Sequence, residues 1–344
     1  MAWEITTADR YRESGVDLDA AERAKSKIGA VLAATRSGLA RGSVGGFGGM
    51  VKLPEDVPDP VLVMSTDGVG TKLLVAIRAG RHDTVGEDLV NHCVNDILAH
   101  GARPVAFQDY IATAAIDPDT VAALVEGVAR GCRGHDMTLS GGETAEMPDL
   151  YHAGHYDLAG TIIGVVSEAD ALHGDRVAVG DVLIGYESSG LHTNGYSLAR
   201  RIVFEEQGLE IGDVIAGLGV TVEDALLSIH RSYYGALAPV LDRVHALAHI
   251  TGGGLPGNLS RSLPPGCGAV IESASWSVPP LFTFLAEAGQ VERDEMFRVF
   301  NMGVGLIAIV PGGAVDAVRA AAAAVGVPTW TMGEVVEDEG VRIE

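Results

Sequence analysis

The sequence has 344 residues, is 47% hydrophobic and carries a formal net charge of −22 at pH 7. This length and composition predict a globular protein with well-formed hydrophobic cores. No apolar run reaches the roughly 18 residues of a membrane span, and the polar N-terminus is unlike a signal peptide. We therefore expect a cytoplasmic location. The acidic charge argues against nucleic acid or an anionic membrane as the main partner, because both favour basic surfaces.

Short apolar runs alternate with helical stretches through residues 60–166. The patterns predict the following elements: strands at 60–66, 104–113, 137–145 and 156–166, and helices at 73–80, 88–101 and 119–136. Strands separated by helices of this length predict a mixed α/β (α+β) fold. A loop-like stretch at 167–180 precedes a second mixed series that includes an alanine-rich helix near the C-terminus. We therefore expect two domains, 1–168 and 169–344.

The first motif, TDGVGTK, follows the first predicted strand. It is not a Walker A loop, because the spacing of its glycines is wrong. At a strand end, Asp67 would project a carboxylate, and Gly68 and Gly70 would let phosphate oxygens approach the backbone beside Thr71. An ordinary Asp-Gly turn is the competing interpretation. The chain has only four lysines, which favours a functional Lys72 that contacts phosphate.

The second motif is a polar arc on the predicted helix 88–101. At 100° per residue, five short polar side chains share one face: Asp88, Asn91, His92, Asn95 and Asp96. A solvated face is the alternative, but the arc contains no Lys, Arg or Glu. Mg²⁺ is commonly bound by one or two carboxylates together with substrate phosphates, so Asp96 and Asp67 are a candidate metal pair. Asp109 either joins them or simply ends a strand.

Two further glycine-rich segments accompany acids or a flexible loop. In GGETAEMP, Glu143 follows two glycines at the end of a predicted strand, so it resembles Asp67 as an acid beside glycines at a strand end. Glu146 is interpreted as a helix-capping residue. The loop GSVGGFGG at 42–49, with Gly45, Gly46 and Gly48, is suited to closing over a nucleotide.

In the second half, ESSGLHTNGY and TGGG are the candidate site motifs. His192 lies in a turn-rich loop rather than on an apolar face, so a site role and a structural role stay equally open. The triple glycine at 252–254 precedes a predicted helix start, where backbone N–H groups can hold a phosphate.

Six motifs in this order, TDGVGTK, DLVNHCVND, GGETAEMP, SSGLHTNGYSL, HITGGG and FNMGVG, closely resemble the phosphoribosylformylglycinamidine cyclo-ligase (AIR synthetase) family. The resemblance covers nearly the whole chain. It implies ATP-dependent ring closure of formylglycinamidine ribonucleotide, a phosphoribosyl small molecule, to aminoimidazole ribonucleotide with release of ADP and phosphate, in purine biosynthesis. It also implies a ferredoxin-like N-terminal domain whose sheet joins a barrel in a homodimer, and a C-terminal α/β domain.

The same resemblance implies roles for particular residues. Mg²⁺ would be held by Asp67, Asp96 and Glu143. ATP would be bound by Gly45, Gly46, Gly48, Gly68, Gly70, Thr71, Lys72, Asn91 and Asn95. Substrate would be bound by Ser188, Ser189, His192, Asn194, Gly252, Gly253 and Gly254. The catalytic set would be Asp67, Lys72, His192 and Asn194. Phosphoryl transfer depends mainly on positioning and charge neutralisation, which agrees with many glycines and short acids.

Related enzymes and a non-enzymatic role are the alternatives. A selenophosphate synthetase would have a reactive cysteine near its N-terminus, whereas the first cysteine here is Cys93. A thiamine monophosphate kinase typically has paired aspartates where this chain has TDGVGTK. A formylglycinamidine ribonucleotide synthetase resembles the motifs less closely. A non-catalytic nucleotide-binding scaffold would bind ATP without substrate-dependent ADP release.

Overall fold

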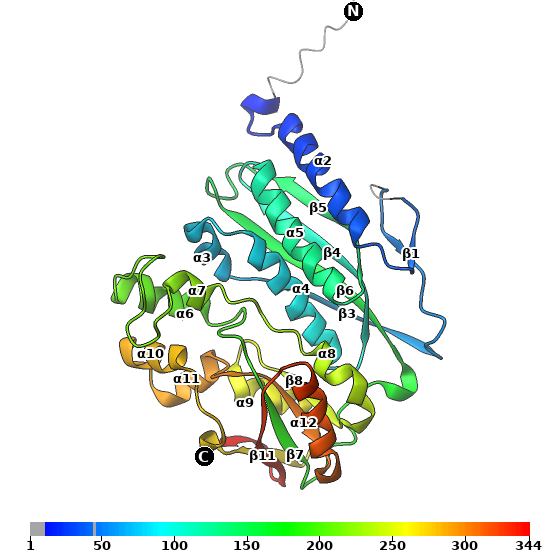
Figure 1. Cartoon of the computed structure of the whole chain (residues 1–344), viewed down its shortest axis with the longest axis vertical. Helices are drawn as coiled ribbons and strands as arrows, with labels where there is room; N and C mark the ends of the chain where they lie inside the picture. Colours follow the sequence, from blue (N-terminus) through cyan, green and yellow to red (C-terminus); the bar gives the residue numbers. More distant parts are fainter. Residues whose placement is uncertain (1–10, 44–45) are drawn as a thin grey trace, which may run out of the picture.

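A computed structural model describes residues 11–43 and 46–344, which form two mixed α/β halves (Figure 1). The first half contains these elements: α2 (Leu18–Ala34), β1 (Ala40–Arg41), β2 (Met50–Val51), β3 (Pro60–Gly68), α3 (Lys72–Ala79), α4 (Asp83–Leu98), β4 (Arg103–Thr113), α5 (Pro118–Gly134), β5 (Thr138–Glu146) and β6 (Tyr156–Ser167). The second half contains these: β7 (Val182–Glu187), α6 (Tyr196–Arg200), α7 (Val222–Leu226), α8 (Tyr234–Leu237), β8 (Ala246–His249), α9 (Gly254–Leu259), β9 (Cys267–Ile271), α10 (Pro280–Ala288), α11 (Arg293–Val299), β10 (Val304–Val310), α12 (Val315–Ala324), β11 (Thr329–Glu337) and β12 (Gly340–Ile343).

The first half is built on a four-stranded sheet in the order β3-β6-β4-β5. Strands β3 and β4 run antiparallel to β6, and β5 runs parallel to β4. Helices α4 and α5 pack together across one face of this sheet, and α2 lies beside α5 (Figure 1). The predicted strands and helices between residues 60 and 166 are confirmed, except that α4 begins at Asp83, five residues before the predicted helix start at residue 88.

Local sequence explains where these helices begin. The carboxylate of Asp17 accepts hydrogen bonds from the backbone N–H groups of Asp19 and Ala20 at the start of α2. Asp117 does the same at the start of α5, where Pro118 occupies the first turn. Such caps satisfy backbone donors that have no partner inside the helix. The helices that cover the sheet are therefore well defined at their N-termini.

The second half is built on a six-stranded sheet in the order β12-β9-β11-β7-β10-β8. All neighbouring strands are antiparallel except β12 and β9, which are parallel. Strand β10 is buried along its entire length, which explains its continuous apolar run VGLIAIV. Strand β8 is the edge of this sheet and contacts α4, so the second half meets the first at that helix.

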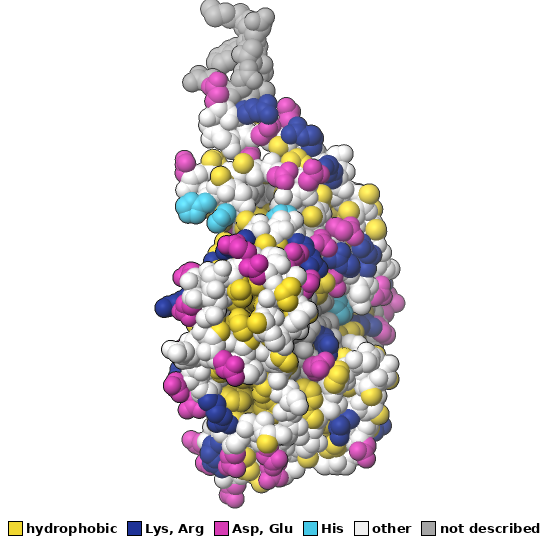
Figure 2. Space-filling model, turned by 60° about the vertical axis from the view of Figure 1, so that its left-hand side comes forward, with side chains coloured by type: hydrophobic (Ala, Val, Ile, Leu, Met, Phe, Trp, Pro, Cys, Tyr) yellow, Lys and Arg dark blue, Asp and Glu magenta, His cyan; other side chains and the backbone are white. Residues whose placement is uncertain are grey.

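The face of the first sheet opposite α4 and α5 is exposed in the single chain. Side chains along β3 alternate between exposed and half-buried, as expected for a strand with one covered face. The exposed face presents Leu62, Met64 and Tyr110, which are 45%, 66% and 37% exposed. On another side of the molecule, Figure 2 shows acidic, basic and hydrophobic side chains interspersed.

Candidate functional site

Two large cavities lie beside the first sheet. The upper pocket, of about 910 Å³, is lined by α2, the described part of 40–50, the middle of β4, and residues 138–144 of β5. The lower pocket, of about 690 Å³, lies between β3, α4, β8 and residues of the 251–262 segment. Thr66 lines the upper pocket and Asp67 the lower pocket, because neighbouring strand residues point to opposite faces.

Two carboxylates converge on one serine hydroxyl in the lower pocket. Ser65 and Asp67, two residues apart on β3, both point toward α4. The Ser65 hydroxyl lies 3.0 Å from Asp96 Oδ2 and 3.3 Å from Asp67 Oδ2. His249 Nδ1, at the end of β8, lies 2.8 Å from Asp96 Oδ1. Burial alone would raise the pKa of Asp96, but His249, His92 and the hydrogen bonding with Asp67 together outweigh burial and hold that pKa well below its usual range. The predicted pair of Asp67 and Asp96 is therefore brought together.

Four histidines are buried beside these carboxylates. The ring of His192 stacks on that of His230 with centroids 4.0 Å apart, and His230 Nε2 lies 3.2 Å from His249 Nε2. His92 Nδ1 is hydrogen-bonded to Thr193 Oγ1 at 2.6 Å. Burial keeps the pKa of His192 and of His230 well below the ordinary histidine value, so both rings are neutral near pH 7.

His92 differs from the other histidines because it faces the carboxylates. Its Nε2 lies 3.5 Å from Asp67 Oδ1 and 3.9 Å from Asp96 Oδ2. Burial opposes the charged form, but the two carboxylates outweigh it and raise the pKa of His92 above its usual value. His92 is the point at which the histidine cluster meets the acids.

The rest of the lower pocket combines amide, backbone and guanidinium groups. Asn194 and Gly252, two of the predicted substrate-binding residues, line it together with Arg261. The amide of Asn258 donates to the carbonyl oxygens of Gly252 and Gly254, at 3.2 and 2.8 Å, and so holds the triple-glycine turn in place. Arg261 is the one lysine or arginine among the described residues of this lining.

The polar arc of α4 is buried rather than solvated, but most of it binds the protein itself. Asn91 Nδ2 donates to the backbone carbonyl of His230 at 2.7 Å. Asn95 donates to the carbonyl of Arg231 at 2.8 Å and accepts from the N–H of Tyr233 at 2.9 Å. These amides hold the 228–233 loop of the second half, so the structure does not support their expected roles as ATP ligands.

Lys72 also differs from its expected role. Its side chain is fully buried, and Nζ lies 2.8 Å from Asp88 Oδ2 and donates to the carbonyl of Ser228 at 2.7 Å. Burial lowers the pKa of Lys72 and raises that of Asp88, and the attraction between the two partly offsets each shift. Lys72 lines neither pocket, so in this structure it is a buried link between the halves and not a phosphate contact.

The remaining motif residues of the first half lie close to one of the second-half loops. Gly70, with φ of 65°, approaches the carbonyl oxygen of Thr193, and Thr71 Oγ1 lies 3.2 Å from Ser197 Oγ. Gly68 ends β3 beside the lower pocket. The TDGVGTK segment therefore meets the SSGLHTNGYSL segment where the two halves join.

Several predicted substrate residues are occupied by internal contacts. Ser188 donates to the carbonyl of Gly190 at 2.9 Å, and Ser189 Oγ donates to that of Ile229 at 2.5 Å. His192 is buried at φ of 61°, and its Nε2 accepts from the N–H of Ser189 at 3.2 Å. In the triple glycine, a Cβ on Gly254 would lie 2.0 Å from the carbonyl oxygen of Phe297. His192, Ser188, Ser189, Gly253 and Gly254 do not line the lower pocket.

The upper pocket contains Glu143, away from Asp67. Along the sheet, Asp67 is in register with Gly160, Asp109 and Gly142, and Glu143 is one residue further. Its side chain therefore leaves the opposite face from Asp67. Within one chain, Glu143 does not join the Asp67–Asp96 pair, which corrects the predicted three-acid metal site.

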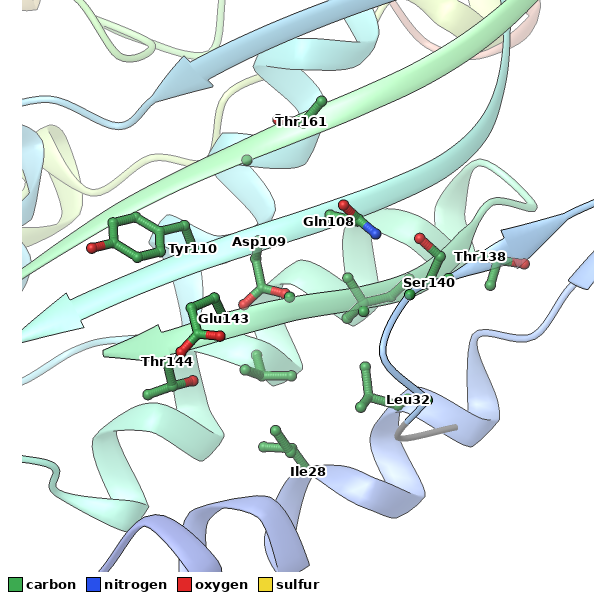
Figure 3. A pocket seen from close by; sticks show the side chains of 18 of the residues that line it. Ile28, Leu32, Gln108, Asp109, Tyr110, Thr138, Ser140, Glu143, Thr144 and Thr161 are labelled. Atoms are coloured by element: carbon green, nitrogen blue, oxygen red, sulfur yellow. The ribbon is translucent and has the colours of Figure 1, made fainter. Parts of the chain in front are cut away.

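Asp109 and the glycine loop also belong to the upper pocket. Figure 3 shows Asp109 and Glu143 on neighbouring strands, with Ile28 and Leu32 of α2 on the facing wall. Burial raises the pKa of Asp109 to about 7. The predicted nucleotide-loop residues Gly46 and Gly48 line this pocket, and Gly45 lies outside the described residues. Glu146 accepts from the N–H groups of Asp17 and Ile116, so it caps chain segments and is not a site residue.

Sequence reasoning missed four residues around the lower pocket. Ser65 could have been found, since it lies two positions before Asp67 and shares its face of the strand. His249 stands in the HITGGG motif but had no assigned role. His230 and Arg261 carried no motif signal, because they reach the site only through the folding of the second half.

Comparison with known proteins places the two halves in one class. Residues 49–166 match the family described as AIR synthase related protein, N-terminal domain, and residues 178–344 match AIR synthase related protein, C-terminal domain. The two matches, which together span most of the chain, define a protein of the AIR synthase related class. A phosphoribosylformylglycinamidine cyclo-ligase of Sorangium cellulosum (strain So ce56) is 50% identical, with 97% of each chain covered. The chain belongs to the phosphoribosylformylglycinamidine cyclo-ligase family.

Solved structures share the fold at low sequence identity. A thiamine-monophosphate kinase from Stenotrophomonas maltophilia K279a aligns with a TM-score of 0.68 at 18% identity and covers 92% of this chain and 96% of its own. The hydrogenase maturation protein HypE in complex with ATP aligns with a TM-score of 0.62 at 19% identity and covers 92% and 86%. In the part of the chain that is described, no helix is long and apolar enough to span a membrane.

Proposed function

We propose that the protein catalyses ATP-dependent cyclisation of formylglycinamidine ribonucleotide to aminoimidazole ribonucleotide, with release of ADP and phosphate, in purine biosynthesis. Relatives named for this activity, one of them 50% identical along nearly the full length, carry the proposal. An amide oxygen is a poor leaving group, so its phosphorylation prepares the carbon for attack by an internal nitrogen. Such chemistry depends on positioning and charge neutralisation, and the lower pocket provides both.

The acids of the lower pocket fit a magnesium ion. Asp67 and Asp96 converge on Ser65 and face a cavity, which is the arrangement of one or two carboxylates that Mg²⁺ uses together with substrate phosphates. Bound there, Mg²⁺ would neutralise phosphate charge. We retain Asp67 and Asp96 as ligands of this Mg²⁺. Glu143 is not included among the ligands from the same chain, because its side chain leaves the opposite face of the sheet.

The two pockets suit two different reactants. We propose that ATP binds in the upper pocket, where Ile28 and Leu32 offer an apolar wall and the loop with Gly46 and Gly48 offers backbone N–H groups. The phosphoribosyl substrate would bind in the lower pocket. There Asn194 and Gly252 supply polar groups, and Arg261 supplies the positive charge that a phosphate needs. The Gly68–Thr71 segment at the domain junction would lie close to the transferred phosphoryl group.

The exposed apolar face of the first sheet supports a homodimer. Leu62, Met64 and Tyr110 are exposed on a face that a second copy would cover, and we propose that two such sheets form a barrel. We also propose the ferredoxin-like description of this half, the division into 1–168 and 169–344, and a cytoplasmic location. The last strand of the first sheet, β6, ends before residue 169, and the first strand of the second sheet, β7, begins after it, which supports the division.

The direct test supplies formylglycinamidine ribonucleotide and Mg-ATP to the purified protein and follows aminoimidazole ribonucleotide. Product is expected in equal amount to ADP, and none is expected when either reactant is omitted. A folded protein that binds ATP but forms no product would contradict the proposal. ADP release that does not depend on the ribonucleotide would favour a different ATP-using activity.

A further inference from the structure

The floor of the lower pocket brings nitrogen ligands together with the acids. One potential ligand atom each from His92, Asp96 and His249 lies within 4.8 Å of the others. These atoms line an accessible cavity rather than a sealed core. The two imidazole rings are nearly perpendicular, at 73° with centroids 5.1 Å apart, and both border the same carboxylate. Asp67 adds a further oxygen 3.5 Å from His92 Nε2.

This cluster lacks a fixed cation. Among the described residues, no lysine or arginine forms an ion pair with Asp67 or Asp96, and the basic side chains nearest to them are histidines. The nearby Ser65 hydroxyl is neutral. Two carboxylates that converge in a partly buried site, with no lysine or arginine paired to them, favour a bound cation, because their mutual repulsion is weakly screened there.

The histidines are held in place from behind, as metal-binding imidazoles usually are. His92 is fixed through Nδ1 by the hydroxyl of Thr193 at 2.6 Å, which leaves Nε2 facing the acids. His249 is fixed through Nε2 by His230 at 3.2 Å, which leaves Nδ1 facing Asp96. Hydrogen bonds to the second ring nitrogen orient metal-ligating histidines and strengthen their binding.

We propose that the floor of the lower pocket is a mixed nitrogen and oxygen site that binds Zn²⁺ in preference to Mg²⁺. His92 Nε2, His249 Nδ1 and a carboxylate oxygen of Asp96 are the ligands, and Asp67 completes a four-ligand set. Zn²⁺ accepts imidazole and carboxylate ligands in tetrahedral geometry, whereas Mg²⁺ requires oxygen ligands in octahedral geometry. One consequence rests on the proposed function, which places Mg²⁺ at Asp67 and Asp96. Zn²⁺ bound at the same carboxylates would exclude Mg²⁺ and so inhibit the enzyme.

The first experiment measures Zn²⁺ binding to the metal-free full-length protein by calorimetry, without ATP or ribonucleotide. One equivalent of Zn²⁺ per chain is expected to bind, and a large excess of Mg²⁺ is expected not to displace it. X-ray absorption of the Zn²⁺ form is expected to show scattering from two imidazole rings. Absence of stoichiometric binding, or a shell of oxygen ligands alone, would overturn the proposal.

Matched histidine variants locate the site. His92→Asn and His249→Asn are each expected to weaken Zn²⁺ binding at least about 10-fold, since each removes one ligand. His100→Asn and His173→Asn change exposed histidines that line the same pocket and are expected to leave binding unchanged. Equal weakening by all four substitutions would contradict the assignment. If either ligand variant does not fold, the absorption spectrum of the unaltered protein still decides the ligand set.

Activity separates this proposal from the proposed function. In the Mg-ATP assay, Zn²⁺ is expected to inhibit at concentrations far below that of Mg²⁺, and a Zn²⁺ chelator is expected to restore the rate. Stoichiometric Zn²⁺ binding in a protein without cyclo-ligase activity would leave the metal site standing and reject the reaction. Full activity without Zn²⁺ binding would do the reverse.

Discussion

The ammonium of Lys72 lies 2.8 Å from the carboxylate of Asp88, and both side chains are fully buried where the two halves meet. Asp88 also accepts the backbone N–H of His230 at 2.7 Å, and Lys72 donates to the carbonyl of Ser228. The pair therefore fixes one end of the 228–233 loop against α4. Because removal of one partner leaves an uncompensated buried charge, such a pair is sensitive to substitution even when its net contribution to stability is small.

The substitution Lys72→Met is expected to destabilise the protein by about 3–5 kcal/mol, because it leaves Asp88 buried without a partner. The melting temperature should fall by on the order of 10 °C in thermal denaturation. Adding Asp88→Asn should recover part of the loss, since it removes the unpaired charge and keeps an acceptor for His230. Lys52→Met, at an exposed lysine that lines neither pocket, is the control and should change little. An unchanged melting temperature with a raised KM for ATP would instead restore the phosphate role.

The substitution Asp67→Asn should reduce turnover far more than stability. Its side chain is 36% exposed, and its hydrogen bond from Ser65 is long at 3.3 Å, so folding depends little on its charge. A ligand of the proposed magnesium ion is expected to matter about 100-fold or more in kcat. Steady-state kinetics and thermal denaturation of the same preparation make the comparison. The exposed Asp294→Asn serves as a control for loss of a carboxylate. Parallel losses of activity and folding would favour a structural role.

The sequence predicted those parts of the site that depend on local pattern. The apolar run at 60–66 placed Asp67 at a strand end, and the 100° spacing on α4 placed His92 and Asp96 on one face. A helical wheel identifies a shared face but not what covers it. Asn91 and Asn95 were therefore assigned to ATP, whereas the 228–233 loop occupies them.

The register between neighbouring strands could not be predicted from local sequence patterns. Asp67 and Glu143 follow the same rule of an acid near a glycine at a strand end, yet one position of register separates them across the sheet. A shift of one residue changes the face of a side chain, and pairing partners come from long-range packing. His230 and Arg261 escaped notice for the related reason that only tertiary contacts bring them to the pocket.

The substitution Met64→Lys should convert the proposed dimer to a monomer. Met64 is 66% exposed on β3, on the apolar face of the first sheet, and a charge there would be costly to bury against a second copy. Light scattering coupled to size-exclusion chromatography measures the mass. Val325→Lys, at an exposed residue after α12 in the other half, should leave the mass unchanged. A monomeric parent protein, or a Met64→Lys variant that keeps the dimer mass, would argue against this face as the interface.

The substitution Asp109→Asn should stabilise the protein increasingly as pH rises. Burial raises the folded-state pKa of Asp109 to about 7, against 3.8 for an ordinary aspartate. Between these values the folded chain keeps a proton that the unfolded chain releases, so the contribution of Asp109 to stability falls from about pH 4 to pH 7 and stays low above it.

Asparagine has no such dependence. Its advantage should grow by about 2–3 kcal/mol between pH 5 and pH 8, on the order of 5 °C in melting temperature. Thermal denaturation at both pH values checks this, with Asp157→Asn, at an exposed carboxylate on β6, as the control. An advantage that does not change with pH would mean that Asp109 is already ionised at pH 5, because only a proton held by the folded state couples its stability to pH in this range.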